Sequence, residues 1–113
     1  FAMRRAVSAL YLDPKLLSYI VDLVQATRQP KLYDDALARW CRFGASPRAS
    51  IALARCARAR AWLDGDEFVA PHHIQLIAPE VLRHRLLLTF EAEAEGITTD
   101  EFIDRLLNLV AIP

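Results

Sequence analysis

The chain has 113 residues, 54% of them apolar, and its 14 acidic and 14 basic residues give a formal net charge of zero at pH 7. This length suits one domain, residues 1–113, whose core needs no metal or disulfide. The zero net charge argues against a domain that binds nucleic acid over its whole surface. No apolar run reaches the length of a membrane span and no signal-peptide pattern is present, so we expect a cytoplasmic protein.

Residues 1–12 are expected to be an incoming linker segment, with Val7, Leu10 and Leu12 able to pack on the body. Asp13 followed by Pro14 is a helix start, with an N-cap and a proline at the first helical position. Apolar residues then recur at three- and four-residue spacing, which predicts an amphipathic helix to about Arg28. The apolar positions of this helix are Leu16, Leu17, Ile20, Val21, Leu23 and Val24.

Residues 31–43 connect this helix to the next, and the pattern predicts a short helix from about Tyr33 to Arg42. Trp40 and Phe43 are expected to cover the core. The two cysteines, Cys41 and Cys56, form no paired motif, so we expect small buried apolar residues rather than a disulfide.

A sharp turn then opens into a helix predicted over 47–63. Gly44 can adopt backbone angles that are costly for other residues. Ser46 is a good N-cap, because its hydroxyl can accept a hydrogen bond from an amide of the first turn. Pro47 suits the first helical position, which places Arg48 inside the first turn.

Arg48 is unusual there, because the positive end of a helix dipole favours Asp or Glu in the first turn. The arrangement is explained if exposed amides, the dipole and the guanidinium converge on one anion of phosphate size. The competing interpretation is an ordinary solvated surface arginine. Arg55 and Arg58 extend the basic face of the same helix. The apolar face is predicted to be Ala52, Leu53, Cys56, Ala57, Ala59 and Leu63.

Gly65 ends this helix, and Pro71 begins the next, whose Ile74, Ile77 and Ala78 are expected to face inward. His72 and His73 lie in its first turn. Adjacent helical residues point apart and no third ligand is close in the sequence, so we predict no metal site. Pro79 is expected to interrupt or restart the helix.

The remainder favours an all-α bundle of about four to six helices, with a short extended strap possible at 86–90. Residues 91–96 predict a short helical turn stopped by glycine. Thr98 and Glu101 form a capping box before a strongly amphipathic helix. Charges are all basic over 48–60 and all acidic over 91–104, which suits head-to-tail contact with a copy or a parent domain, or two ordinary solvated faces.

Four segments together resemble the C-terminal lid domain of MoxR-type AAA+ ATPases: Gly-Ala-Ser-Pro-Arg-Ala-Ser, Leu-Asp-Gly, Val-Ala-Pro and Val-Leu-Arg-His-Arg. They begin at residues 44, 63, 69 and 81, and the first and last are the specific ones. Ala70 departs from the family, which usually has threonine before the proline. The resemblance covers roughly residues 17 to 113.

This resemblance implies that Arg48, with Ser46 and Pro47 at the helix N-terminus, contacts the phosphates of ATP as the sensor-2 arginine. The segment Arg83-His84-Arg85, and Arg55, would contact the ATPase core or the next subunit, although a polar helix end explains Arg83-His84-Arg85 equally well. ATP and Mg²⁺ would be bound by an N-terminal ATPase core that lies outside this chain. Phe1 is not an initiator residue, so we expect a fragment. Because the sequence has no Gly-rich phosphate loop followed by Lys-Ser or Lys-Thr and no acidic metal site, we expect this fragment to hydrolyse nothing alone.

The resemblance also implies a hexameric ring, chaperone-like maturation of other proteins and, as a possible partner, a von Willebrand factor A-domain protein. Two other functions stay open. One is a nucleic-acid-binding helical domain that uses the basic helix 48–60, although Arg60 points away from the other arginines. The other is a protein-interaction bundle in which Arg48 has no role in any nucleotide reaction.

Overall fold

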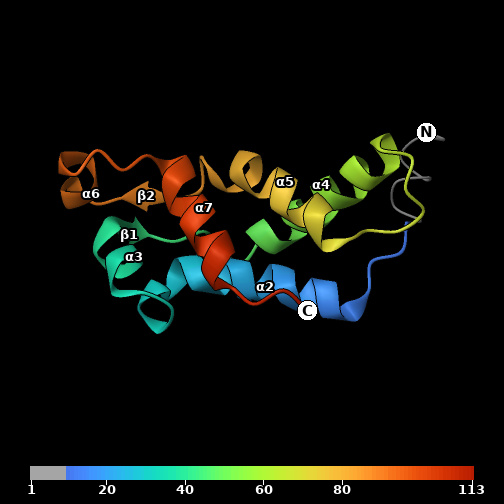
Figure 1. Cartoon of the computed structure of the whole chain (residues 1–113), viewed down its shortest axis with the longest axis horizontal. Helices are drawn as coiled ribbons and strands as arrows, with labels where there is room; N and C mark the ends of the chain where they lie inside the picture. Colours follow the sequence, from blue (N-terminus) through green and yellow to red (C-terminus); the bar gives the residue numbers. More distant parts are fainter. Residues whose placement is uncertain (1–9) are drawn as a thin grey trace.

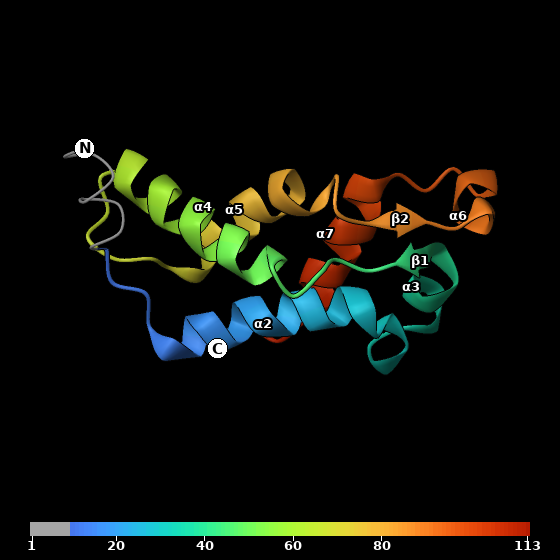
Figure 2. The same cartoon turned by 180° about the vertical axis from the view of Figure 1, so that it is seen from behind.

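The computed structural model describes residues 10–113, which form an elongated helical domain with extents of 47 × 24 × 21 Å. Figure 1 shows α2 (Pro14–Arg28) along one side, with α4 (Ala49–Leu63) and α5 (Pro71–Leu82) packed on each other opposite it and α7 (Thr99–Leu109) running from beside the end of α5 to α2. The view from behind shows α4 lying over α5 (Figure 2). The predicted all-α bundle is confirmed, with six α-helices in the described residues.

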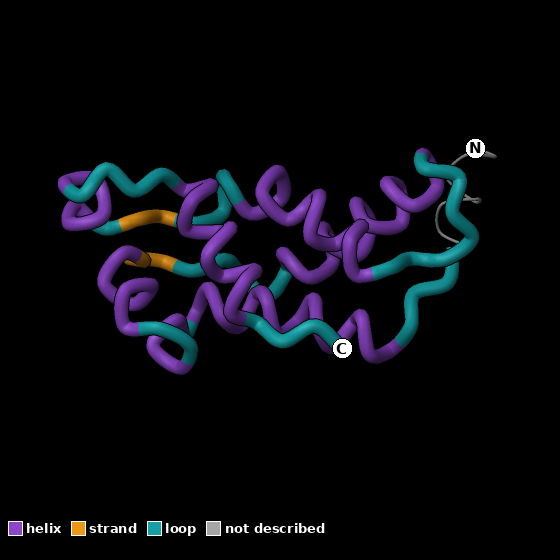
Figure 3. The backbone as a smooth tube through the Cα atoms, viewed as in Figure 1, coloured by secondary structure: helices purple, strands orange, loops and turns teal. Residues whose placement is uncertain are grey.

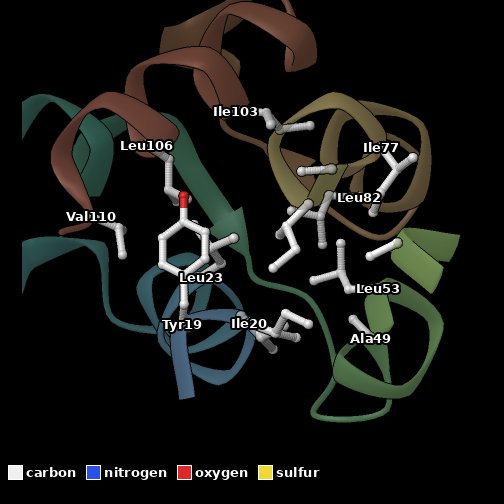
Figure 4. Close-up of a cluster of buried hydrophobic side chains, with 14 of the residues drawn as sticks. Tyr19, Ile20, Leu23, Ala49, Leu53, Ile77, Leu82, Ile103, Leu106 and Val110 are labelled. Carbon is white, nitrogen blue, oxygen red and sulfur yellow. The ribbon is translucent and has the colours of Figure 1, made fainter. Parts of the chain in front are cut away.

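The core lies where these four helices meet (Figure 4). Tyr19, Leu53 and Phe102 are among the largest fully buried side chains. Ile74, Ile77 and Ala78 face inward as predicted. Besides the residues just named, the core cluster contains Leu16, Ile20, Leu23, Val24, Leu37, Ala49, Ala57, Leu82, Ile103 and Leu106.

Helix starts agree with the caps read from the sequence. The Asp13 carboxylate accepts a hydrogen bond from the Lys15 amide at 2.8 Å, as expected for an N-cap. Thr98 and Glu101 form the predicted capping box at the start of α7. Gly96, with φ of 75°, follows the short α6 (Phe90–Ala94).

One end of the domain holds a small two-stranded sheet (Figure 3). The strands β1 (Cys41–Phe43) and β2 (Leu87–Leu88) are antiparallel, and they lie beside α3 (Asp35–Trp40), the 3-10 helix η1 (Pro30–Leu32) and α6. The strap predicted near 86–90 is therefore β2. The helix predicted to Arg42 was too long, because the Trp40 carbonyl accepts a hydrogen bond from the Thr89 amide at 2.8 Å and the chain continues as a strand.

Several predicted side-chain positions were wrong. Phe43, which was expected to cover the core, is 60% exposed, whereas Trp40 packs against the core as predicted. Cys41 is half-buried and Cys56 is exposed. Leu17 and Val21 also lie on the outer side of α2.

The buried face of α4 also differs from the predicted one. Ala54 and Ala61 are buried where Cys56 and Leu63 were expected, and Leu63 is 72% exposed. Because the alanines of α4 lie on several of its faces, the apolar pattern alone does not define which face is buried.

The incoming segment packs on the domain as expected, but Pro79 does not interrupt its helix. Leu10 and Leu12 pack against the core, and Tyr11 pairs with Phe68 in a parallel bridge; Val7 lies outside the described residues. Pro79 does not break α5, which continues to Leu82. No helix among the described residues is long and apolar enough to cross a membrane.

Candidate functional site: the turn before α4

The turn that precedes α4 is held by the end of α2. Thr27, 1% exposed, donates its hydroxyl to the Val24 carbonyl at 2.6 Å and accepts a hydrogen bond from the Ala45 amide at 3.0 Å. Arg28 donates to the Ala45 carbonyl at 3.4 Å. Both backbone groups of Ala45 are therefore bound to α2, and this fixes the chain three residues before Arg48.

Gly44 has a different role from the one the sequence suggested. Its φ is not in the left-handed region, where only Gly65 and Gly96 lie in the described chain. A Cβ on Gly44 would instead lie 2.2 Å from the Thr27 carbonyl oxygen and 2.7 Å from the Arg28 Cα. Glycine is required here because the two backbones are in direct contact.

The Ser46 hydroxyl accepts a hydrogen bond from the Arg48 amide at 3.2 Å, but Arg48, not the predicted Ser46, occupies the N-cap position of α4. The Ala49 and Ser50 amides donate to the Ser46 and Pro47 carbonyls at 2.9 and 3.1 Å. The first turn therefore has three-residue hydrogen bonds, and α4 begins at Ala49, two residues after the predicted start. The amides of residues 48–50 already have acceptors, so the Arg48 guanidinium is the charged donor of this turn that is left for an anion.

Of the four arginines between residues 48 and 60, two are engaged within the domain. Arg58 donates to the Leu10 carbonyl at 3.3 Å, and Arg60 forms a 3.2 Å ion pair with Asp64. Arg48 and Arg55 are exposed and have no hydrogen bond or ion pair through their guanidinium groups with residues 10–113. They are seven residues apart, so they lie on the same face of the helix.

The other predicted contact residues lie after α5. Arg83 is held by two hydrogen bonds to Asp100, at 2.7 and 3.1 Å, and this pairing raises the pKa of Arg83. Arg85 donates to the Val81 carbonyl at 3.1 Å, while His84 is exposed. The structure thus gives Arg83 a contact within the domain and leaves His84 and Arg85 at the surface.

The neighbourhood of the histidine pair differs from the expectation that no third ligand is near. Ligand atoms of Asp64, Asp66, His72 and His73 all lie within 4.8 Å of one another. However, the buried His73 accepts a hydrogen bond at Nδ1 from the Ala70 amide at 2.8 Å, and its Nε2 lies 2.7 Å from Asp66.

This geometry assigns the proton of the neutral His73 ring to Nε2, where it is donated to Asp66. A metal at Nε2 would need a fully deprotonated ring as long as Nδ1 accepts the amide hydrogen bond. His73 therefore acts as the side-chain cap of α5 in a place where Ala70 offers none, and the absence of a metal site stays a prediction.

Sequence reasoning missed Thr27 as the residue that positions the turn. A polar Thr-Arg pair at the end of an otherwise apolar helix face was the available signal. Its partner, the Ala45 backbone, has no sequence signature at all.

The sequence model of the AAA lid domain family matches residues 38–106. The chain belongs to this family, and it is a C-terminal lid domain of the MoxR type of AAA+ ATPase.

The relatives support that assignment. Chaperone MoxR1 of Mycobacterium tuberculosis is 42% identical over 99 residues, covering 87% of this chain and 26% of MoxR1. Protein MoxR of Methylorubrum extorquens is 38% identical over 92 residues, covering 77% of this chain and 26% of that protein. A protein from Cytophaga hutchinsonii assigned as an ATPase has a crystal structure that superposes with a TM-score of 0.91 at 39% identity, covering 96% of this chain and 33% of that one. The chain therefore spans a quarter to a third of the proteins it matches.

Proposed function

We propose that Arg48 is the sensor-2 arginine of a MoxR-like ATPase and contacts the phosphates of ATP that the rest of the protein binds with Mg²⁺. The single observation that carries this proposal is an exposed guanidinium with no partner in the described chain, at a turn whose backbone is fixed by Thr27 and Arg28. A solvated surface arginine needs no such fixed backbone.

The chemistry follows from the charge that develops during hydrolysis. Negative charge accumulates on the transferred phosphoryl group and the leaving oxygen, and a guanidinium held in place stabilises it without reorganisation. Because Arg48 precedes α4, and α4 packs against α5 and α2, a change at the γ-phosphate would move the lid as a unit. Hydrolysis would then be coupled to remodelling or maturation of a partner protein.

The assembly is proposed on the family resemblance. The lid would contact its own ATPase core and neighbouring subunits of a hexameric ring in the cytoplasm, with a von Willebrand factor A-domain protein as a possible partner. Arg55, His84 and Arg85 are the exposed basic residues available for such contacts, and Arg83 would have to give up or share Asp100.

Nucleotide binding by the complete protein tests the role of Arg48. We expect Arg48→Ala to weaken binding of a non-hydrolysable ATP analogue by about tenfold or more, since one charge-assisted contact is worth about 1.5–3 kcal/mol, and to change ADP binding much less. Arg60→Ala is the matched control, because Arg60 lies on the same helix but pairs with Asp64. Equal affinities of wild type and Arg48→Ala for the analogue would remove Arg48 from the site.

A further inference from the structure

A groove of about 620 Å³ opens between α4 and α5. Its floor is apolar and its edges carry a histidine, an arginine and a glutamate. The lining residues are Ala52, Cys56, Ile77, Glu80, Val81, His84 and Arg85. Arg55 is adjacent to Cys56 on α4 and is exposed, so the charged residues at the groove are Arg55, Arg85 and the acidic Glu80.

An exposed aromatic side chain beside acidic residues lies at the sheet end of the domain. Phe90 is 85% exposed, the highest value among the large apolar side chains of the described chain. It begins α6, where Glu91, Glu93 and Glu95 follow it, all exposed. Aromatic side chains are enriched among the residues that contribute most to protein contacts, so Phe90 is a candidate anchor for one.

We infer that Phe90 of one copy of this chain inserts into the α4–α5 groove of a second copy. The two surfaces are complementary in both respects that matter. An aromatic side chain meets the apolar lining of the groove, and the acidic turn of α6 meets Arg55 and Arg85. Within that turn, Glu91 lies 3.7 Å from Arg39 and Glu95 accepts a hydrogen bond from the Trp40 indole at 2.6 Å, so Glu93 is the carboxylate without such a partner in the described residues.

Phe90 cannot reach the groove of its own chain. Both views place α6 at the sheet end of the molecule, beyond the α4–α5 pair (Figures 1 and 2). The α6 segment is also held there, because Thr89 donates its hydroxyl to the Arg39 carbonyl at 2.7 Å and its amide to the Trp40 carbonyl at 2.8 Å. The contact therefore joins two subunits.

This contact does not depend on Arg48 binding a nucleotide, although it involves the same helix. Ala52 and Cys56 line the groove four and eight residues after Arg48. A neighbour seated in the groove would thus press on α4, the helix that begins next to Arg48.

The test uses Cys56 as a reporter, because it is an exposed thiol inside the groove. Cys41, the other thiol of this chain, is poorly reactive, since burial raises its pKa to about 11. In the complete protein, with cysteines outside this chain replaced by serine, Phe90→Cys is introduced and mild oxidation is followed by electrophoresis without reductant. Leu32→Cys is the matched control, being 73% exposed in η1.

We expect Phe90→Cys to give at least about tenfold more cross-linked subunits than Leu32→Cys, because a seated thiol has a high effective concentration. The cross-link should disappear when Cys56→Ser is added and weaken at high salt, because the flanking charges are exposed. Equal cross-linking of Phe90→Cys and Leu32→Cys, or a cross-link that survives Cys56→Ser, would overturn the proposal. Neither readout requires ATP turnover, so this proposal and the role of Arg48 can fail separately.

Discussion

Gly44 lies against the backbone of α2 so closely that a single added carbon has no space. The nearest atoms to its missing Cβ are backbone atoms of Thr27 and Arg28, at 2.2 to 2.7 Å, and these cannot move aside as a flexible side chain would. The contact brings the turn onto the end of α2, where Thr27 and Arg28 bind Ala45. The position of Arg48 is therefore decided by a glycine four residues earlier.

We expect Gly44→Ala to lower the free energy of unfolding by about 2–3 kcal/mol, because overpacking a rigid site typically costs this much. Urea unfolding followed by circular dichroism measures the change. Gly96→Ala serves as comparison: it has a positive φ but nothing within 4 Å of the added carbon, so its cost should be nearer 1 kcal/mol. A Gly44→Ala variant as stable as wild type would contradict the close approach.

The Thr27 hydroxyl is the second determinant of the turn. Thr27→Val keeps the shape but leaves the buried Ala45 amide without its acceptor, so we expect a loss of about 1–3 kcal/mol in stability. Thr27→Ser keeps the hydroxyl and should lose less, through the missing methyl group only. If packing rather than the hydrogen bond holds the turn, Thr27→Val should instead be more stable than Thr27→Ser. Chemical denaturation of the two variants measures which is more stable.

At the scale of elements, helix starts could be predicted from the sequence and some helix faces could not. Asp13, Ser46 and Thr98 act through local hydrogen bonds that a short sequence pattern encodes. The β1–β2 pairing joins residues more than 40 positions apart, and nothing local marks it. The buried face of α4 was misjudged because alanine is compatible with both a packed and an exposed surface.

The start of α5 shows an element stabilised in a way the sequence did not suggest. Ala70 cannot cap the helix, and the buried His73 accepts the Ala70 hydrogen bond through Nδ1 instead. We expect His73→Leu to lower the free energy of unfolding by about 1–2 kcal/mol, the usual value of a lost cap.

His73→Gln is the informative partner variant, because glutamine at the third helical position can accept the same amide hydrogen bond. It should be more stable than His73→Leu in thermal unfolding at neutral pH. If both variants unfold at the wild-type temperature, the ring of His73 contributes nothing to the helix start.

For the whole molecule, the role of Arg48 at an anion stays a prediction, while the local surroundings expected for it were wrong. The amides of the first turn were expected to face the anion, yet those of residues 48–50 have acceptors within the turn. The contacts of Arg58 with Leu10 and of Arg83 with Asp100 depend on tertiary packing, which no spacing rule reveals. Arg60 differs, because its pair with Asp64 has the i,i+4 spacing that the sequence already displays. Among the described residues, only Arg48 and Arg55 of the predicted basic stripe stay exposed without a hydrogen bond or ion pair through their guanidinium groups.

The account as a whole depends on Arg48 acting at the nucleotide, and steady-state ATP hydrolysis by the complete protein tests this most directly. Wild type, Arg48→Ala and Arg60→Ala should be compared at saturating ATP, with assembly checked by sedimentation. We expect Arg48→Ala to lower turnover on the order of a hundredfold, as for other preorganised donors at developing negative charge, with Arg60→Ala close to wild type. Unchanged turnover in an Arg48→Ala protein that folds and assembles normally would contradict the account and leave the lid with a purely structural role.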